Sequence, residues 1–292
     1  MPEPVSTVPV TVILTAYRRA DTAIATLGRI RQCDPQPAEI LVHVDGGEGA
    51  CRAALEHAFP DIRVLLSDSN VGPGGGRNRL VAAASQELVA SFDDDSYPID
   101  GDYFARLIEV FRQFPEAAVV DAHVFHLNQR IEPDTSQAQW VADFSGGGCA
   151  YRRAAFLETG GYVPLPTAYG MEEVDFGLRL HAGGGRVLRS GRLRVFHHTD
   201  LSHHADPTVT SASIVNIALL AYLRYPWTLW AVGVAQCVNR LQWLLRHGRR
   251  RGVLAGLTAI PATLARYRGH RHPLPSQSIR SFLALRRHAQ PA

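Results

Sequence analysis

Lysine is absent from this 292-residue sequence, and all 30 basic residues are arginines. The glycine-rich run Gly72–Gly76 therefore has no following Gly-Lys-Ser/Thr, which excludes a P-loop. Cysteine is also scarce: the four residues show neither a CxxC pair nor zinc-ligand spacing, which fits a reducing cytosol. The first residues lack the basic start and apolar core of a signal peptide. These features predict a cytoplasmic protein without disulfides.

Acidic residues are missing from the last part of the chain. All 27 lie at or before Asp206, which gives the first part a net charge of −9. From Pro207 onward there are 12 arginines and no acid, so that part carries +12. Such a split predicts two regions with different surroundings: a first domain over 1–206 and a basic helical region over 207–292.

Long apolar runs are missing as well. The uncharged stretches Thr208–Leu223 and Tyr225–Asn239 both fall short of the roughly 20 apolar residues that a membrane span needs. Aromatic and aliphatic residues bordered by arginines are typical of a helix on an anionic membrane, here the inner face of the plasma membrane. The alternative is a helical subdomain that covers the core or forms a homodimer contact. Nucleic acid is disfavoured as a partner, because the first region is net negative.

What the chain does contain is a series of short apolar segments that end in polar or glycine-rich residues. Strands are predicted over 9–15, 39–44, 62–66 and 87–92, and a helix over 78–86 after a glycine-rich loop. Alternation of strands and helices predicts an α/β fold with a mainly parallel, doubly wound sheet. Ligands of such sheets bind at the carboxyl ends of the strands.

Three consecutive carboxylates, Asp93, Asp94 and Asp95, follow the fourth of these strands. Neighbouring carboxylates repel one another unless a hard cation or sugar hydroxyls lie among them, and Mg²⁺ or Mn²⁺ is the usual partner. Because strand side chains alternate, Asp93 and Asp95 are expected on one side and Asp94 on the other. A solvated acidic turn is the alternative.

The ordered set of motifs resembles the family 2 glycosyltransferases, which are inverting enzymes with a GT-A fold. Five segments carry the resemblance, which spans roughly residues 8–204: Thr15-Ala16-Tyr17-Arg18, Asp45-Gly46-Gly47, Asn70–Asn78, Asp93-Asp94-Asp95 and Met171–Arg179. The resemblance implies transfer of a sugar from a nucleotide-diphosphate donor to an acceptor hydroxyl of a glycan, a lipid-linked molecule or a small molecule. It also implies a bound Mn²⁺ or Mg²⁺. The alternatives are a nucleotidyltransferase on a similar fold and a non-catalytic, membrane-associated protein that binds sugar nucleotides.

The resemblance assigns a role to each motif. The donor would contact Asp93, Asp94 and Arg77. Asp45 and Tyr17 would line the pocket for the nucleotide base. Asp95 would hold the metal, joined by Asp93 and by His197 or His198 from the cluster His197–His204. Glycines would let the donor sugar or acceptor approach the backbone. The full donor set is Thr15, Ala16, Tyr17, Arg18, Asp45, Gly76, Arg77, Asp93, Asp94, Gly147 and Gly148.

Inversion requires a base that removes the acceptor proton during attack from the opposite face of the sugar. The resemblance places this base in the acidic pair Glu172-Glu173, with Glu173 favoured and Glu172 the alternative. Glu173 is one methylene longer than the family's usual aspartate. A helix start favours the ionised form of both acids, which is also the structural alternative for them. Asp175 and Arg179 are four residues apart and are expected to form an ion pair.

Overall fold

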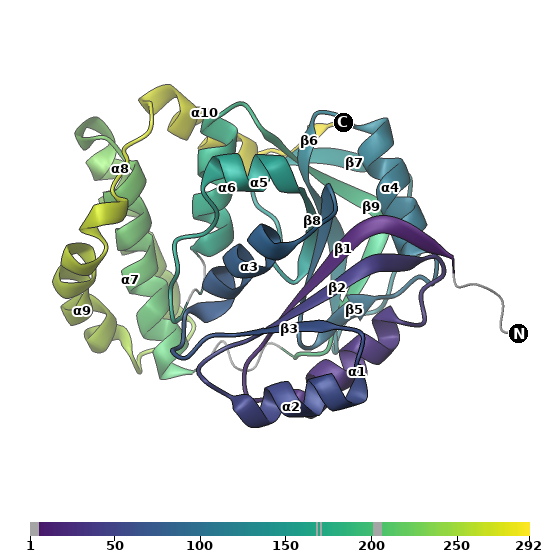
Figure 1. Cartoon of the computed structure of the whole chain (residues 1–292). Coiled ribbons are helices and arrows are strands. Elements are labelled where there is room, and N and C mark those ends of the chain that lie inside the picture. Colours follow the sequence, from purple (N-terminus) through teal and green to yellow (C-terminus); the bar gives the residue numbers. More distant parts are fainter. Residues whose placement is uncertain (1–5, 168, 170, 201–205) are drawn as a thin grey trace, which may run out of the picture.

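The computed structural model describes residues 6–167, 169, 171–200 and 206–292. Within these residues one ten-stranded sheet has the order β10-β7-β9-β6-β8-β4-β1-β2-β3, and β5 pairs with β9. Figure 1 shows this sheet between helices, with α7, α8 and α9 grouped at one side of the molecule.

The N-terminal half of the sheet is parallel. β1 pairs in parallel with both β2 and β4, and β2 pairs in parallel with β3. All four strands therefore end at the same edge, as the sequence predicts, and the doubly wound α/β fold is confirmed. The elements are β1 (Thr7–Ala16), α1 (Ala20–Ile30), β2 (Gln36–Val44), α2 (Gly49–Ala58), β3 (Arg63–Leu66), α3 (Gly72–Ala83) and β4 (Leu88–Asp93).

The other half of the sheet is mixed. β8 runs antiparallel to β4 and β6, whereas β6 and β9 are parallel. The elements are β5 (Ser96–Pro98), α4 (Tyr103–Gln113), β6 (Ala117–His126), β7 (Ala138–Val141), β8 (Gly148–Arg152), α5 (Arg153–Thr159), α6 (Glu172–Ala182) and β9 (Arg186–His197). This half brings the start of α6 and the end of β9 to the edge where β4 ends.

The sheet is buried on both faces because its side chains alternate. On β1, Val12 and Leu14 pack in one apolar cluster with α1, α2 and α4, whereas Ile13 packs in a second cluster with α3 and α5. Helices therefore cover each face, which explains the near-continuous apolar sequence of these strands.

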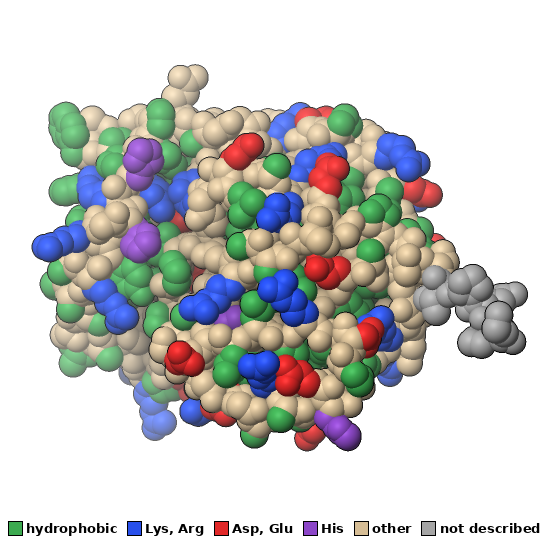
Figure 2. All heavy atoms as spheres, in the orientation of Figure 1, with side chains coloured by type: hydrophobic (Ala, Val, Ile, Leu, Met, Phe, Trp, Pro, Cys, Tyr) green, Lys and Arg blue, Asp and Glu red, His purple; other side chains and the backbone are tan. Residues whose placement is uncertain are grey.

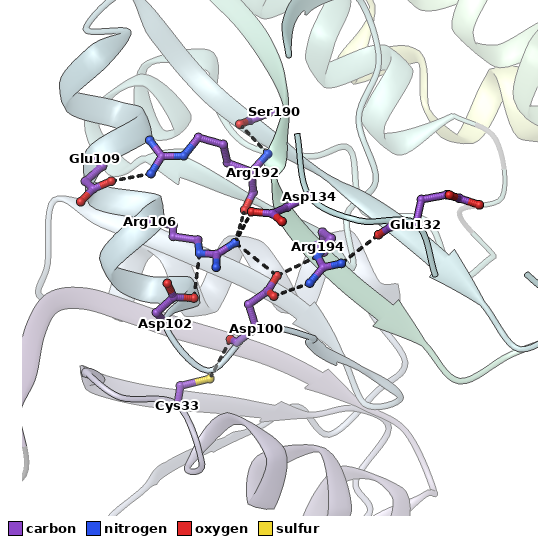
Figure 3. Close-up of polar contacts among 10 residues, drawn as sticks. All are labelled: Cys33, Asp100, Asp102, Arg106, Glu109, Glu132, Asp134, Ser190, Arg192 and Arg194. Carbon is purple, nitrogen blue, oxygen red and sulfur yellow. Dashed lines mark hydrogen bonds and ion pairs between the residues drawn. The ribbon is translucent and has the colours of Figure 1, made fainter. Parts of the chain in front are cut away.

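Arginine–carboxylate pairs fasten α4 and the 127–137 segment to β9 (Figure 3). Arg106 lies 2.7 Å from Asp102 and 2.9 Å from Asp134. Arg194 on β9 donates from Nε to Asp100 over 3.0 Å. These residues lie outside the cleft described below, so we assign them a structural role.

Helix α3 differs from the prediction: it begins at Gly72, not at Asn78, and ends at Ala83. Glycine is a poor helix former, so the run Gly74-Gly75-Gly76 was expected to be a loop. The carboxylate of Asp45 accepts hydrogen bonds from the backbone N–H groups of Val71 and Gly72 and so stabilises the helix start. The absence of side chains lets this turn pack closely, because a Cβ on Gly74 would lie 2.5 Å from the Glu172 carboxyl.

The C-terminal region is helical, as predicted. It comprises α7 (Pro207–Arg224), α8 (Trp230–Arg246), α9 (Val253–Arg266), α10 (Ser276–Arg287), the short turns Trp227–Leu229 and Arg268–His270, and the edge strand β10 (Gln290–Pro291). No helix among the described residues is long and apolar enough for a membrane span. Packing of this region on α6 forms a third apolar cluster that includes Val174, Leu219 and Phe282.

A buried ion pair joins this region to α6. Asp175 and Arg179 pair as predicted, with 2.9 Å between Arg179 Nε and Asp175 Oδ2. Arg224 of α7 also contacts Asp175, at 2.5 Å from Nε to Oδ1, and both side chains are buried. The division at residues 206 and 207 coincides with the start of α7 and stays a proposal.

Candidate active site

A cleft of about 760 Å³ lies at the edge where β1, β2 and β4 end. Its walls come from the ends of these strands, the start of α3, the aspartate triplet and the segment after β9. The lining includes Thr15, Ala16, Tyr17, Arg19, His43, Asp45, Asn70, Asp93, Asp94, Asp95, Pro166, His197 and His198. The location confirms the expectation from the strand ends, and the predicted aspartates and histidines are brought together.

The aspartate triplet is arranged differently from the prediction. β4 ends at Asp93, so the alternation of strand side chains does not continue through Asp94 and Asp95. Both of these instead contact Arg19, whose Nε lies 3.0 Å from Asp94 Oδ2 and whose Nη1 lies 2.9 Å from Asp95 Oδ2. Burial raises the pKa of Asp94 to about 7. Asp93 pairs with Arg77.

Asp95 also lies beside His197. The distance from His197 Nε2 to Asp95 Oδ1 is 2.9 Å, and the backbone N–H of His198 donates to the Asp95 carbonyl over 2.7 Å. Burial opposes the charged form of His197, but the carboxylates of Asp95 and Asp93 outweigh it and raise the pKa of the imidazole. Asp95 Oδ1 has no hydrogen bond of standard geometry within the described residues. Its near polar neighbour is His197 Nε2, at 2.9 Å.

The histidine cluster divides into separate parts. His197 and His198 both line the cleft, and His197 contacts the Asp95 side chain. His203 and His204 lie outside the described residues. Among the described residues, no three His, Cys, Asp or Glu side chains converge closely enough for a protein-only metal site.

Asp45 lines the cleft, but its carboxylate is already engaged. Oδ1 accepts from Ser67 Oγ over 2.7 Å and from Val71 N over 2.9 Å, and Oδ2 accepts from Gly72 N over 2.9 Å. Asp45, which was expected to contact the nucleotide base, thus stabilises the start of α3. It shapes the pocket and has little free hydrogen-bonding capacity.

His43 is a residue that the sequence interpretation missed. It lies near the end of β2, two residues before Asp45, and lines the cleft. The side chain is buried, and its Nε2 has no hydrogen-bond partner within the described part of the chain. Burial lowers the pKa of His43, so the ring is neutral near pH 7 and Nε2 can serve a ligand as donor or acceptor. Its strand-end position was the signal that could have identified it.

Arg18, predicted at the donor site, does not line the cleft, whereas its neighbour Arg19 does. Arg18 has a left-handed backbone with φ of 61°, and its exposed side chain pairs with Glu48 at 2.8 Å. That backbone turn directs Arg18 outward and leaves Arg19 in the cleft. Tyr17 lines the cleft with a partly exposed ring, as predicted for a residue that contacts the base.

Arg77 and Gly76 also differ from expectation, because neither lines the cleft. Arg77 is buried, donates from Nε to Ser91 Oγ over 3.0 Å and pairs with Asp93. It lies beneath the site and fixes Asp93, so direct contact with a nucleotide is not supported. Gly76 accommodates His43, since a Cβ there would lie 2.6 Å from His43 Nδ1.

The glycine run after β7 accommodates the protein's own side chains. A Cβ on Gly147 would lie 2.2 Å from Asp93 Oδ2, and one on Gly148 would lie 2.6 Å from the Val124 side chain. The Gly146 carbonyl accepts from Ser91 Oγ over 2.7 Å. The predicted ligand approach to Gly147 and Gly148 is therefore replaced by close packing against Asp93 and the core.

Glu172 and Glu173 open α6, as predicted, but neither lines the cleft. Glu172 is buried against Gly74, and burial raises its pKa well above the usual range. Glu173 lies against Gly146 and near Arg77; burial raises its pKa although Arg77 opposes the shift. Burial thus opposes the effect of the helix start and raises the pKa of both carboxyl groups, where the helix dipole alone would lower it.

Comparisons with known proteins agree with this geometry. Residues 11–132 match the model of glycosyl transferase family 2. A segment of 102 residues is 33% identical to the succinoglycan biosynthesis protein ExoO of Rhizobium meliloti (strain 1021). That match covers 34% of this chain and 29% of the relative, so this chain matches less than a third of that protein. The match confirms the family resemblance that the motifs predicted.

Two solved structures are similar over most of the chain. The mannosyltransferase PcManGT of Pyrobaculum calidifontis, in complex with GDP-Man and Mn²⁺, has a TM-score of 0.56 and 16% identity. That similarity covers 98% of this chain and 90% of the other. GalNAc-T7, with UDP, GalNAc and Mn²⁺, has a TM-score of 0.58 and 13% identity over 78% of this chain and 49% of that one. The fold is therefore of the GT-A type.

Proposed function

Because the chain carries the sequence pattern of glycosyl transferase family 2 on a GT-A fold, we propose that it is an inverting, metal-dependent glycosyltransferase. It moves a sugar, of the hexose class, from a nucleotide-diphosphate donor to an acceptor hydroxyl. The observation that carries the proposal is the meeting of Asp93, Asp94, Asp95 and His197 in one cleft at the strand ends. Carboxylate and imidazole groups are ligand types that Mn²⁺ accepts, and the phosphates of the donor would complete its coordination.

Asp95 and His197 fit a divalent cation. The buried Asp95 Oδ1 lacks a hydrogen bond of standard geometry within the described residues, and His197 Nε2 lies 2.9 Å from it. Mg²⁺ in such sites is usually held by one or two carboxylates together with substrate phosphates, so the donor itself would supply further ligands. A bound Mn²⁺ or Mg²⁺ would neutralise charge on the departing diphosphate.

Arg19 is placed to bind the diphosphate of the same donor. Its guanidinium is partly exposed in the cleft and holds both Asp94 and Asp95. A planar guanidinium binds phosphate oxygens through paired hydrogen bonds, so Arg19 can turn from the aspartates to the donor diphosphate. The nucleoside then lies toward Tyr17 and His43, at the ends of β1 and β2, and toward Asn70, before α3.

Glu173 is the proposed base. In the reaction the acceptor oxygen forms a bond to the anomeric carbon, the bond from that carbon to the diphosphate breaks, and the acceptor proton passes to the Glu173 carboxylate. Burial raises the pKa of Glu173, which brings a carboxylate closer to the working pH of a general base. Glu173 is also near Arg77, which pairs with Asp93 on the cleft wall. Glu172, buried against Gly74, is the alternative.

The test separates turnover from binding. Release of nucleoside diphosphate from UDP-, dTDP- and GDP-hexoses is measured with water as acceptor, for wild type, Glu173→Gln and the exposed control Glu158→Gln. The transferase predicts a loss of roughly 100-fold or more in Glu173→Gln with donor affinity retained, since a general base contributes about that much. Equal turnover in Glu173→Gln would remove Glu173 as base. Nucleotide binding without any turnover would favour a binding protein, and pyrophosphate formation from a nucleoside triphosphate would favour a nucleotidyltransferase.

A further inference from the structure

The outer face of α8 and the turn before it carry an exposed apolar stripe. The exposed fractions are 80% for Trp227, 49% for Trp230, 63% for Val234, 45% for Val238 and 44% for Leu245. Steps of three, four, four and seven residues place these side chains on one face of a helix. At 1.5 Å per residue the stripe is about 27 Å long. Exposed apolar surface of this extent marks an interaction site.

Arginines lie at both ends of the stripe. The guanidinium of Arg271 is 5.7 Å from the ring centroid of Trp230. At the other end, Arg246 follows Leu245 as the last residue of α8, and Arg249, Arg250 and Arg251 come shortly after the helix. Arginine and tryptophan side chains each have an apolar body and a polar part. The two together are therefore suited to the boundary between lipid headgroups and acyl chains.

The charge around the stripe is of one sign. Of the 12 arginines after residue 206, only Arg224 and Arg286 form ion pairs within the described residues. Figure 2 shows the region over α8 and α9 with hydrophobic, arginine and histidine side chains and no acidic ones. Two copies of this face would repel each other, whereas an anionic surface would attract it.

We propose that the α8 face docks on an anionic lipid bilayer, with the helix in the plane of the surface. Trp227, Trp230, Val234, Val238 and Leu245 enter the interface, and the arginines contact headgroup phosphates. The proposal is independent of the proposed reaction, since no residue of the cleft takes part in it.

The first test uses the unmodified full chain. Sedimentation is measured with vesicles of phosphatidylcholine alone and of phosphatidylcholine with phosphatidylglycerol, at low and high salt. Docking predicts sedimentation with the anionic vesicles that weakens as salt rises, because screening shortens the reach of the charges. Iodide quenching of tryptophan fluorescence should fall on binding, since Trp227 and Trp230 become covered. Sedimentation that is equal with both vesicle types, or absent at low salt, would overturn the proposal.

The second test uses matched variants. Replacing Arg249, Arg250 and Arg251 by Gln should weaken binding to anionic vesicles roughly 100-fold, since each basic residue contributes about fivefold. The matched charge control replaces the exposed Arg63, Arg112 and Arg130 by Gln and should bind as wild type. Trp230→Ser with Val234→Ser should also reduce binding, whereas Leu157→Ser, equally exposed on α5, should not.

Far-ultraviolet circular dichroism and thermal unfolding confirm that each variant is folded before its binding is compared. Two results contradict the docking proposal. One is equal loss of binding in the charge control and the Arg249–Arg251 variant. The other is concentration-dependent self-association that the Trp230 and Val234 substitutions abolish in the absence of vesicle binding, which would identify the face as an interface between copies.

Discussion

Glu172 is a buried carboxyl group whose two oxygens have no hydrogen bond of standard geometry within the described residues. Its raised pKa means that the folded protein holds a proton that the unfolded chain releases near pH 4.5. In that range the folded state binds more protons than the unfolded state, so the free energy of unfolding falls as pH rises. This stabilisation is fully present below the unfolded pKa and is lost toward the folded pKa.

Glu172→Gln should therefore stabilise the protein at neutral pH, because a buried amide needs no proton uptake on folding, and each pKa unit between the folded and unfolded states corresponds to about 1.4 kcal/mol. Urea unfolding at pH 4 and pH 8 measures the effect, with the exposed Glu158→Gln as control. The gain should be larger at the higher pH. A gain that is equal at both pH values, or a loss at pH 8, would contradict the account of Glu172.

His43 provides a second prediction at the scale of one residue. Its Nε2 is buried and unpartnered within the described residues and faces the cleft, whereas the Asp45 carboxylate is engaged by backbone amides. His43→Phe should weaken binding of the preferred nucleotide about tenfold, the value of one hydrogen bond. Affinity for inorganic pyrophosphate with Mn²⁺ should not change, because pyrophosphate has no base. Calorimetric titration measures both, and the exposed His57→Phe is the control.

Asp45 is a single residue whose contacts stabilise the start of a whole helix. Its carboxylate holds Val71 N and Gly72 N at the start of α3, a helix that opens with four glycines and one proline in its first five residues. Asp45→Ala should destabilise the fold by about 1–3 kcal/mol, since buried donors lose their acceptor. Hydrogen exchange at Val71 and Gly72 should accelerate more than exchange in β1. Asp68→Ala, an exposed neighbour, should leave both measurements unchanged.

At the scale of helices and strands, some features of the fold could be predicted from the sequence and others could not. The strand ends and the cleft were predictable because apolar runs of this length form buried strands, and parallel strands end at one edge. The start of α3 at Gly72 was not, because glycine propensity argues against a helix and the Asp45 contact spans 27 residues. The position of Arg77 beneath the cleft could not be predicted either, because its pairing with Asp93 depends on tertiary packing. The raised pKa values of Glu172 and Glu173 result from burial, which cannot be inferred from their position at the start of a helix.

At the scale of the whole molecule, Arg224 joins the basic helices to α6. Arg224 and Asp175 are both buried, and Arg179 shares the same carboxylate. Arg224→Ala removes one of the two guanidinium groups that hold Asp175 and leaves Arg179 as its partner, so it should cost about 1–3 kcal/mol, the range for buried hydrogen bonds to a charged group. Urea unfolding compares it with Arg280→Ala, an exposed residue of α10. A cost below about 1 kcal/mol, the range of surface pairs, would mean that this pair does not hold the two regions together.

The central claim is that the cleft binds a nucleotide diphosphate together with a divalent cation at Asp95. Thermal unfolding with UDP, dTDP, GDP and CMP, each with and without Mn²⁺, tests it most directly, because a ligand of the native state raises the midpoint. We predict a shift for one nucleotide that requires Mn²⁺ and is lost in Asp95→Ala, while the exposed control Asp68→Ala keeps it. No shift with any nucleotide, or an equal shift in Asp95→Ala, would contradict the account.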